Sequence, residues 1–238
     1  MTVIAMTAHR RPEYTHEVLQ SLSQCSEDIR SIPVFIYVDH GCEEVSLLCR
    51  RWQSASPLNV SVFTSAGNLG CNGNTWRALD GAFRCSDSVI MLEDDTVLAK
   101  DAIRFFLFCL DRFKHDADVF SVSGYNRADT LKLDAIRQLG RRKWFTPWGW
   151  ATWKDRYDDI VEARQKVKVS PRLSWDIFVT DNARRGRQEV FPVVSRVQNI
   201  GAENGAHVPS PEWHRQNQHT PAWAGIFGDI APGDWVLT

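Results

Sequence analysis

Short apolar runs alternate with amphipathic stretches through the first half of the chain. A run of about four to eight apolar or alternating residues between polar boundaries is typical of a strand, and apolar positions three and four apart are typical of a helix. The pattern predicts strands at residues 3–8, 33–39, 59–64 and 88–93, and helices that open at Pro12 or cover residues 43–53, 75–83 and 101–113. This order favours a mostly parallel sheet with helices on both faces.

The second half is less regular. Most of the ten tryptophans lie between Trp144 and Trp235, and the segment Trp144–Trp153 is interpreted mainly as core, with sugar-ring stacking as the alternative. Residues 198–215 are rich in Gly, Asn and Pro and show no periodicity. Such a segment predicts a lid over a binding site, with a permanently packed loop as the alternative.

Composition limits the classes of partner. The chain has 238 residues and a net charge of −1, so it is long enough for a real core and offers no bulk field for nucleic acid or an anionic membrane. No run of about 18 apolar residues and no signal segment stands out, so we expect no membrane span and a cytoplasmic protein. Six cysteines without a CxxC pair predict free thiols.

An acidic cluster follows the central predicted strand. Glu93, Asp94 and Asp95 come directly after the apolar run that begins at Ser88, at the sheet edge where ligands of open α/β sheets bind. Adjacent carboxylates raise one another's pKa unless a cation is bound, and their oxygens suit Mg²⁺ or Mn²⁺ carried in on a diphosphate. The alternative is a solvated acidic turn that caps the next helix.

Two further polar features stand at predicted strand ends. Gly67–Asn74 has turn chemistry between a strand and a helix, so its backbone N–H groups are suited to approach a phosphate or a ribose. It lacks the spacing of a P-loop or of Gly-x-Gly-x-x-Gly. Asp39 ends the second strand and has two interpretations, acceptance from a base or ribose and simple capping of the next turn.

Together these residues resemble a known family. Arg10-Arg11-Pro12, Asp39, Asn68-Leu-Gly, Arg77 and Glu93-Asp94-Asp95 are similar in order and type to the motifs of GT-A glycosyltransferases, above all the N-acetylglucosaminyltransferase I family. The C-terminal half extends the resemblance through Trp175-Asp176, Arg184-Arg-Gly-Arg187, Ser195-Arg196 and the segment from Gly205 to His207.

The resemblance implies a fold and an activity. The expected fold is a single GT-A domain over 1–238, a Rossmann-like and mostly parallel sheet flanked by helices, with a nucleotide-binding half (1–125) and an aromatic-rich acceptor-binding half (126–238). The expected activity is inverting, metal-dependent transfer of a sugar, with GlcNAc as the candidate, from a UDP-sugar to a hydroxyl of a glycan, peptide or small molecule. Mn²⁺ or Mg²⁺ is the expected cofactor.

The resemblance also implies roles for single residues. Asp95 is the expected metal ligand, and Asp176 is the expected catalytic base, although the family has two adjacent acids where this chain has Asp176-Ile177. The expected nucleotide-sugar residues are Arg10 or Arg11, which the sequence does not separate, and Asp39, Asn68, Arg77, Glu93, Asp94, Trp150, Arg196 and His207. Within the aromatic segment, Gly149 and Trp150 are expected at the donor because Gly permits close backbone approach.

Three alternatives stay open at this point. A nucleotidyltransferase would share the acidic metal site but would be expected to carry a Gly-rich loop after the first strand, where this chain has His9-Arg10-Arg11-Pro12. A non-catalytic carbohydrate-binding protein would use the aromatic patch but would not need both Asp95 and Asp176. A retaining transferase would share the metal site and differ in the configuration of its product.

Overall fold

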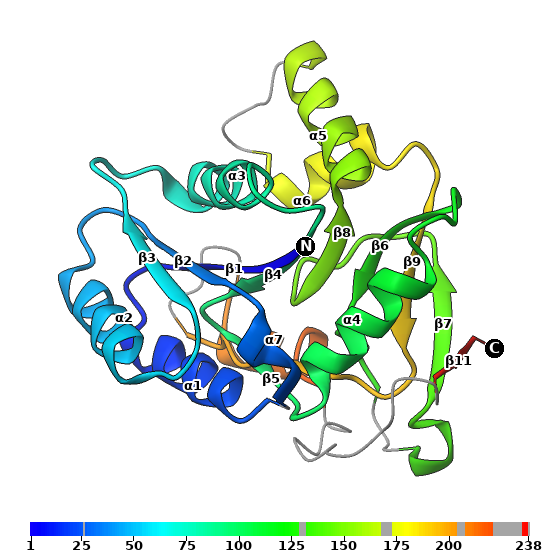
Figure 1. Cartoon of the computed structure of the whole chain (residues 1–238). Coiled ribbons are helices and arrows are strands. Elements are labelled where there is room, and N and C mark those ends of the chain that lie inside the picture. Colours follow the sequence, from blue (N-terminus) through cyan, green and yellow to red (C-terminus); the bar gives the residue numbers. More distant parts are fainter. Residues whose placement is uncertain (26, 129–131, 168–172, 204–207, 221–234, 238) are drawn as a thin grey trace.

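The protein is a mixed α/β structure built on one large sheet (Figure 1). The computed structural model describes residues 1–25, 27–128, 132–167, 173–203, 208–220 and 235–237. Within these residues the sheet has nine strands in the order β11-β7-β9-β6-β8-β4-β1-β2-β3, and a separate ribbon pairs β10 with β5. The strands are β1 (Thr2–Ala8), β2 (Val34–Val38), β3 (Val60–Thr64), β4 (Ser88–Glu93), β5 (Thr96–Leu98), β6 (Val119–Ser123), β7 (Gln138–Arg142), β8 (Trp150–Trp153), β9 (Gln188–Pro192), β10 (Val197–Asn199) and β11 (Val236–Leu237).

Helices cover both faces of this sheet. They are α1 (Pro12–Ser23), α2 (Glu43–Ala55), α3 (Gly70–Ala82), α4 (Ala102–Arg112), α5 (Lys154–Lys166), α6 (Trp175–Phe178) and α7 (Pro211–Asn217). Helices α1, α2 and α4 lie on one face and α3, α5 and α6 on the other (Figure 1). Successive residues of β1 therefore enter different cores, with Ile4 and Met6 on the α1 side and Val3 and Ala5 on the α3 side.

The four strands expected in the first half form the parallel part of the sheet. Strand β1 pairs in parallel with both β2 and β4, and β2 pairs in parallel with β3. Each predicted helix is also present, although α3 begins at Gly70, five residues before the expected Thr75. The fold class predicted from the apolar pattern is thereby confirmed.

The aromatic segment supplies an element that the sequence did not suggest. Strand β8 inserts antiparallel between β4 and β6, and places Trp150 beside Met91 and Ser123. Residues 138–142 form a further strand, β7, next to β9. The parallel order of the first half thus changes to a mixed order at β8, beside the central acidic strand.

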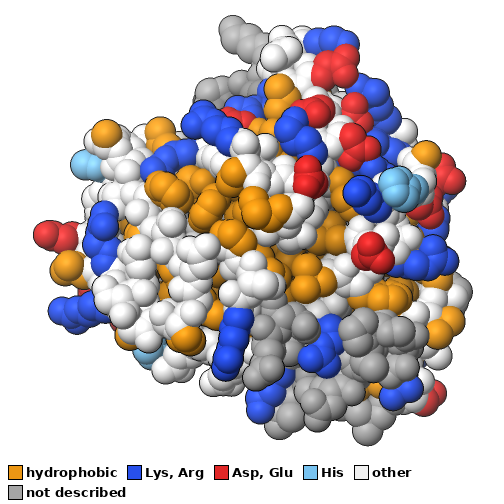
Figure 2. All heavy atoms as spheres, viewed as in Figure 1, with side chains coloured by type: hydrophobic (Ala, Val, Ile, Leu, Met, Phe, Trp, Pro, Cys, Tyr) orange, Lys and Arg blue, Asp and Glu red, His pale blue; other side chains and the backbone are white. Residues whose placement is uncertain are grey.

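Three further features concern the cysteines, the surface side chains and the length of the helices. All six cysteines are free, as predicted. Basic and acidic side chains are interspersed on the face shown in Figure 2, around apolar side chains that gather in its middle. Among the helices of the described ranges, none is both long and apolar enough to cross a bilayer.

Candidate functional site

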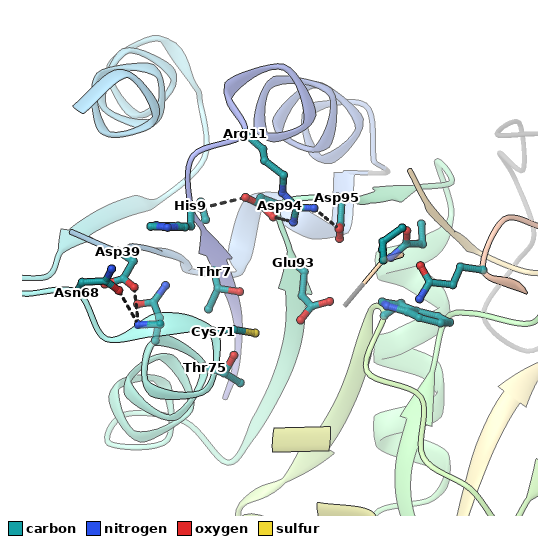
Figure 3. Close-up of a pocket in the computed structure, with 17 residues that line it drawn as sticks. Thr7, His9, Arg11, Asp39, Asn68, Cys71, Thr75, Glu93, Asp94 and Asp95 are labelled. Carbon is teal, nitrogen blue, oxygen red and sulfur yellow. Dashed lines mark hydrogen bonds and ion pairs between the residues drawn. The ribbon is translucent and has the colours of Figure 1, made fainter. Parts of the chain in front are cut away.

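A pocket of about 360 Å³ lies at the carboxyl ends of β1, β2 and β4 (Figure 3). The parallel strands place their ends at one edge of the sheet, so side chains far apart in sequence meet there. The pocket is lined by Thr7, Ala8, His9, Arg11, Asp39, Asn68, Gly70, Cys71, Asn74, Thr75, Glu93, Asp94, Asp95, Trp148, Asn199, Val208 and Gln218. Six of the predicted site residues are among them: Arg11, Asp39, Asn68, Glu93, Asp94 and Asp95.

The acidic motif forms the centre of this pocket. Glu93 ends β4 next to Thr7 of β1, and Asp94 and Asp95 make the turn into β5. Burial, with added repulsion from Asp95 and Asp94, raises the pKa of Glu93 well above its ordinary value. Burial also raises the pKa of Asp94 to about 6, although Arg11 opposes the shift. The cluster is therefore poised to gain from a bound cation.

Arg11 and Arg10, which the sequence left unseparated, have different positions. Arg11 reaches from α1 to the acids (Figure 3), and forms ion pairs with Asp94 and, at 2.8 Å, with Asp95. Arg10 is exposed, does not line the pocket and has a backbone φ of 53°. Of these two arginines, Arg11 is the one that lines the pocket and is placed to contact a diphosphate there.

Asp95 has the features of a metal ligand. Its Oδ2 faces Arg11, whereas its Oδ1 is buried and has no hydrogen-bond partner. Within the described residues, no group of three or more His, Cys, Asp or Glu side chains is placed to hold a metal by itself. An orphaned carboxylate oxygen fits Mn²⁺ or Mg²⁺ held by one or two protein carboxylates, with phosphate and water in the other positions.

The backbone after β10 closes tightly on Asp95. The N–H of Ile200 donates to the carbonyl of Asp95 at 2.9 Å, which extends the antiparallel pairing of β10 with β5. A Cβ at position 201 would overlap the Asp95 carboxylate, so only Gly201 permits this approach. The β10 segment is thus part of the wall around Asp95.

Asp39 directly follows β2 and holds the start of α3. Its carboxylate accepts from the N–H groups of Leu69 at 3.0 Å and Gly70 at 2.9 Å and from the Ser65 hydroxyl at 2.8 Å. Burial alone would raise the pKa of Asp39, but these hydrogen bonds lower it below its ordinary value. Asn68 accepts from the same Gly70 N–H, at 2.9 Å. Asp39 therefore both lines the pocket and caps the turn that the sequence marked as Gly-rich.

Asp176 lies on α6, beyond the residues that line the cavity. Its carboxylate accepts a hydrogen bond from the Ser174 hydroxyl. The neighbouring Trp175 ring stacks on Trp150 with centroids 5.8 Å apart. Burial is the main cause that raises the pKa of Glu93, and repulsion from Asp176 adds a smaller contribution to that shift. Asp176 is thus close enough to Glu93 for its charge to disfavour ionisation of that carboxyl group.

Trp150 does not line the pocket. It is fully buried in β8, stacked on Trp175 and edge-on to Phe145 at 4.8 Å. Gly149 has a φ of +56° and approaches Val197 closely, so its lack of a side chain serves core packing. The pocket is lined instead by Trp148, which packs edge-on against Tyr125 at 4.8 Å.

Arg77 and Arg196 also lie away from the pocket lining. The guanidinium of Arg77 stands over the Tyr37 ring at 5.3 Å, on the α3 side of the sheet. Arg196 is fully buried and pairs with Asp101 at 3.1 Å, so its charge is compensated inside the fold. His207 lies outside the described residues.

The segment expected as a lid is built into the structure at both ends. Residues 197–199 form β10, and Pro211 opens α7 behind Ser210, whose side chain accepts from the Trp213 N–H at 3.1 Å. His214 of α7 is buried and contacts Asn199 Oδ1 through Nε2 at 2.7 Å. The content of Gly, Asn and Pro did not predict these elements. A helix is nevertheless possible at Pro211, because a proline in the first turn is compatible with a helix.

Several pocket residues were not predicted from sequence. They are Thr7, Ala8, His9, Gly70, Cys71, Asn74, Thr75, Trp148, Asn199, Val208 and Gln218. For Cys71, Asn74 and Thr75 the signal was present, since they stand in or beside the Gly-rich stretch. Asn199 and Gln218 reach the pocket only through the pairing of β10 and the packing of the α7 segment.

Comparison with known proteins gives a structural likeness. Neither a protein-family model nor a curated protein matches the sequence. The mannosyltransferase PcManGT from Pyrobaculum calidifontis, in complex with GDP-Man and Mn²⁺, superposes with a TM-score of 0.61 at 15% identity over 85% of this chain and 57% of its own. Staphylococcus aureus TarS with UDP-GlcNAc gives a TM-score of 0.59 at 12% identity over 82% of this chain and 57% of its own.

A third similar structure covers nearly the whole chain. GalNAc-T7 with UDP, GalNAc and Mn²⁺ gives a TM-score of 0.63 at 12% identity over 98% of this chain and 46% of its own. The chain has the GT-A fold. It spans about half the length of these solved glycosyltransferase chains, and at such identities the likeness establishes the fold alone.

Proposed function

We propose that this GT-A chain is a metal-dependent glycosyltransferase that moves a sugar from a nucleotide sugar to an acceptor hydroxyl. The observation that carries the proposal is the meeting of Asp39, Asp95 and Arg11 in one pocket at the carboxyl edge of the sheet. A nucleotide sugar needs polar partners for its base and ribose and positive charge for its diphosphate. Asp39 offers the first, and Arg11 together with a cation on Asp95 offers the second.

The proposed donor is a UDP-sugar, with UDP-GlcNAc as the candidate. Asp95 would hold Mn²⁺ or Mg²⁺ through Oδ1, the buried oxygen without a hydrogen-bond partner. When bound, such a cation neutralises charge on the leaving diphosphate. Arg11 adds a fixed positive charge at the same place, and Glu93 and Asp94 line the space for the ribose and bound water.

Asp176 is the proposed general base. As the acceptor oxygen bonds to the anomeric carbon, the bond from that carbon to the diphosphate oxygen breaks with its electron pair. The proton of the acceptor hydroxyl passes to the Asp176 carboxylate. One base on the side opposite the leaving group gives inversion at the anomeric carbon, so no second nucleophile is needed.

The two halves of the chain divide this work in the proposal. Residues 1–125 supply Asp39, Arg11 and the acidic motif, and would bind the nucleotide. Residues 126–238 supply Asp176 and the pocket-lining Trp148. This half would bind the acceptor, which is a glycan, a peptide or a small molecule with a free hydroxyl. The similar structures support a nucleotide-sugar donor by their bound GDP-Man, UDP-GlcNAc and UDP.

A donor screen tests the proposal. Thermal unfolding of the chain is measured with UDP-, GDP- and dTDP-sugars, each with and without Mn²⁺, because a ligand that binds only the native state raises the melting temperature. We expect stabilisation by UDP-sugars that requires Mn²⁺. If GDP-mannose is the one sugar nucleotide that stabilises the chain, the proposed UDP-sugar donor is wrong. If none of the sugar nucleotides stabilises the chain, the proposed activity is contradicted. An NMR spectrum of the product then checks inversion, and retention would remove Asp176 as the base.

A further inference from the structure

One side chain fastens the helix of the proposed base to the helix at the donor pocket. Asn72 lies in the first turn of α3, and its Nδ2 donates to the carbonyl of Leu173 at 2.8 Å. Its Oδ1 accepts from the N–H of Trp175 at 3.0 Å. About a hundred residues of chain separate the partners, so these bonds join two distant segments directly.

The chemistry of the partners fixes the orientation of this amide. A backbone carbonyl only accepts and a backbone N–H only donates, so the Asn72 nitrogen faces Leu173 and its oxygen faces Trp175. The N–H of Trp175 is also one of the donors that the start of a helix leaves unpaired. Asn72 satisfies this donor from outside α6, a helix that has no hydrogen bond from its own capping side chain.

One ring stack and three hydrogen bonds then determine where Asp176 lies. The Trp175 ring is buried and stacks on Trp150, which fixes the depth of α6 in the core. The two bonds from Asn72 hold the backbone on either side of Ser174, whose hydroxyl donates to Asp176. A ring in a core fixes position, whereas two backbone bonds also fix rotation, and rotation decides where the next carboxylate points.

The same turn of α3 belongs to the donor pocket. Asp39 accepts from the Gly70 N–H at 2.9 Å, and Cys71 and Asn74, on either side of Asn72, line the pocket. We infer that Asn72 is a positioning residue that sets the Asp176 carboxylate relative to the donor. The inference rests on the proposed function, in which Asp176 accepts the proton of the attacking hydroxyl.

The test is a double-mutant cycle on turnover and binding. The variants are Asn72→Ala, Asp176→Asn and the double variant, with UDP-GlcNAc and Mn²⁺ as the probe and release of UDP to water as the rate. UDP affinity is measured by calorimetry with Mn²⁺. Because misplacement by about 1 Å can cost about 10²-fold in rate, we expect Asn72→Ala to lose about 10²-fold in kcat with UDP affinity within a few-fold. In the Asp176→Asn background the same change should cost little, since a residue that acts through another is non-additive with it.

A matched control separates positioning from stability. Asn126 also bridges distant backbone, donating from Nδ2 to the Val193 carbonyl at 2.7 Å, and it does not line the pocket. Asn126→Ala should lower the melting temperature as Asn72→Ala does and leave kcat unchanged. Asn72→Ser, which has a smaller volume change, replaces the alanine variant if that variant does not fold.

The outcomes distinguish this inference from the proposed function. Normal turnover in Asp176→Asn, or no turnover of UDP-GlcNAc by the native chain, overturns the proposed base or donor and the inference with it. A large loss in Asp176→Asn with normal kcat in both Asn72 variants overturns the inference alone. Equal falls in UDP affinity and kcat, or additive losses in the double variant, also overturn it, because Asn72 would then act on the donor or on the fold.

Discussion

Arg11 forms an ion pair with Asp95 in which Nη1 lies 2.8 Å from Oδ2 and both side chains are largely buried. Burial alone would lower the pKa of Arg11, but Asp95 and Asp94 raise it above its ordinary value, so the guanidinium stays charged. The acidic motif is therefore partly neutralised by the protein itself. A cation on Asp95 would share this carboxylate with Arg11 and would use the oxygen that Arg11 leaves unpaired.

Replacement of Arg11 tests this internal compensation. Arg11→Gln leaves three neighbouring carboxylates without their positive partner, and their repulsion should lower the melting temperature. Mn²⁺ should then raise the melting temperature more in the variant than in the native chain, since the cation replaces the lost charge. Arg10→Gln, at the adjacent exposed position, should behave like the native chain. Equal Mn²⁺ shifts in the Arg11 variant and the native chain would contradict the compensation.

Asp95, the proposed metal ligand, is tested by a neutral isostere. Asp95→Asn removes the charge of the only motif carboxylate with a buried, unpaired oxygen, so we expect weaker Mn²⁺-dependent binding of UDP by calorimetry. Far-ultraviolet circular dichroism should be unchanged, because the carboxylate lies at the sheet edge. Asp111→Asn, on the exposed side of α4, is the control. Undiminished Mn²⁺-dependent UDP affinity would remove Asp95 as the ligand.

Asp176, the proposed general base, is tested by comparing the effect of its replacement on turnover with the effect on UDP binding. A positioned general base contributes about 10² to 10⁴ in rate, so Asp176→Asn should lose turnover by this factor and keep UDP affinity within a few-fold. Asp181→Asn, an exposed change in the turn that follows α6, should keep normal turnover. If binding falls as much as turnover, Asp176 acts on the donor and not on the proton.

Asp39 gives a prediction about pH. Its pKa is lowered in the folded chain, so its contribution to stability is present above the unfolded pKa of about 3.9 and is lost as pH falls through the folded value. Asp39→Asn should therefore unfold at lower urea than the native chain at pH 7, and the gap should close below about pH 4. Asp111→Asn should show no such gap. A gap that persists at low pH would mean that the lost contacts do not depend on the charge.

Replacement of Arg196 distinguishes a structural role of this residue from the nucleotide-binding role that the resemblance implies. Its guanidinium is fully buried on Asp101 and also donates to the carbonyl oxygens of Val194 and Ile136. Removal of one partner of a buried pair costs about 3–5 kcal/mol, so Arg196→Met should lose this much in urea unfolding at unchanged UDP affinity. Arg215→Met, whose side chain is 67% exposed, should change stability little. If Arg196→Met loses UDP affinity and keeps native stability, Arg196 is a donor-binding residue after all.

The sequence by itself determined the elements whose causes are local. The apolar runs determined β1, β2 and β4, because a strand buried on both faces is apolar at most positions. The edge strand β3 followed from the alternation of apolar and polar residues in its sequence. The acids after β4 had to reach the carboxyl edge, since parallel strands end together there. For this reason Asp39, Asn68 and the Glu93-Asp94-Asp95 motif were found in the pocket from pattern and resemblance alone.

Only the tertiary structure decided which of several similar side chains faces the site. Arg11 differs from Arg10, and Trp148 from Trp150, by one or two residues, and the direction of each side chain depends on backbone angles and on partners far away in the chain. Arg196 turned inward because Asp101, about a hundred residues earlier, is buried beside it. Asn72 meets the backbone around Trp175 only because α3 and α6 pack on the same face of the sheet, a contact that no local pattern encodes.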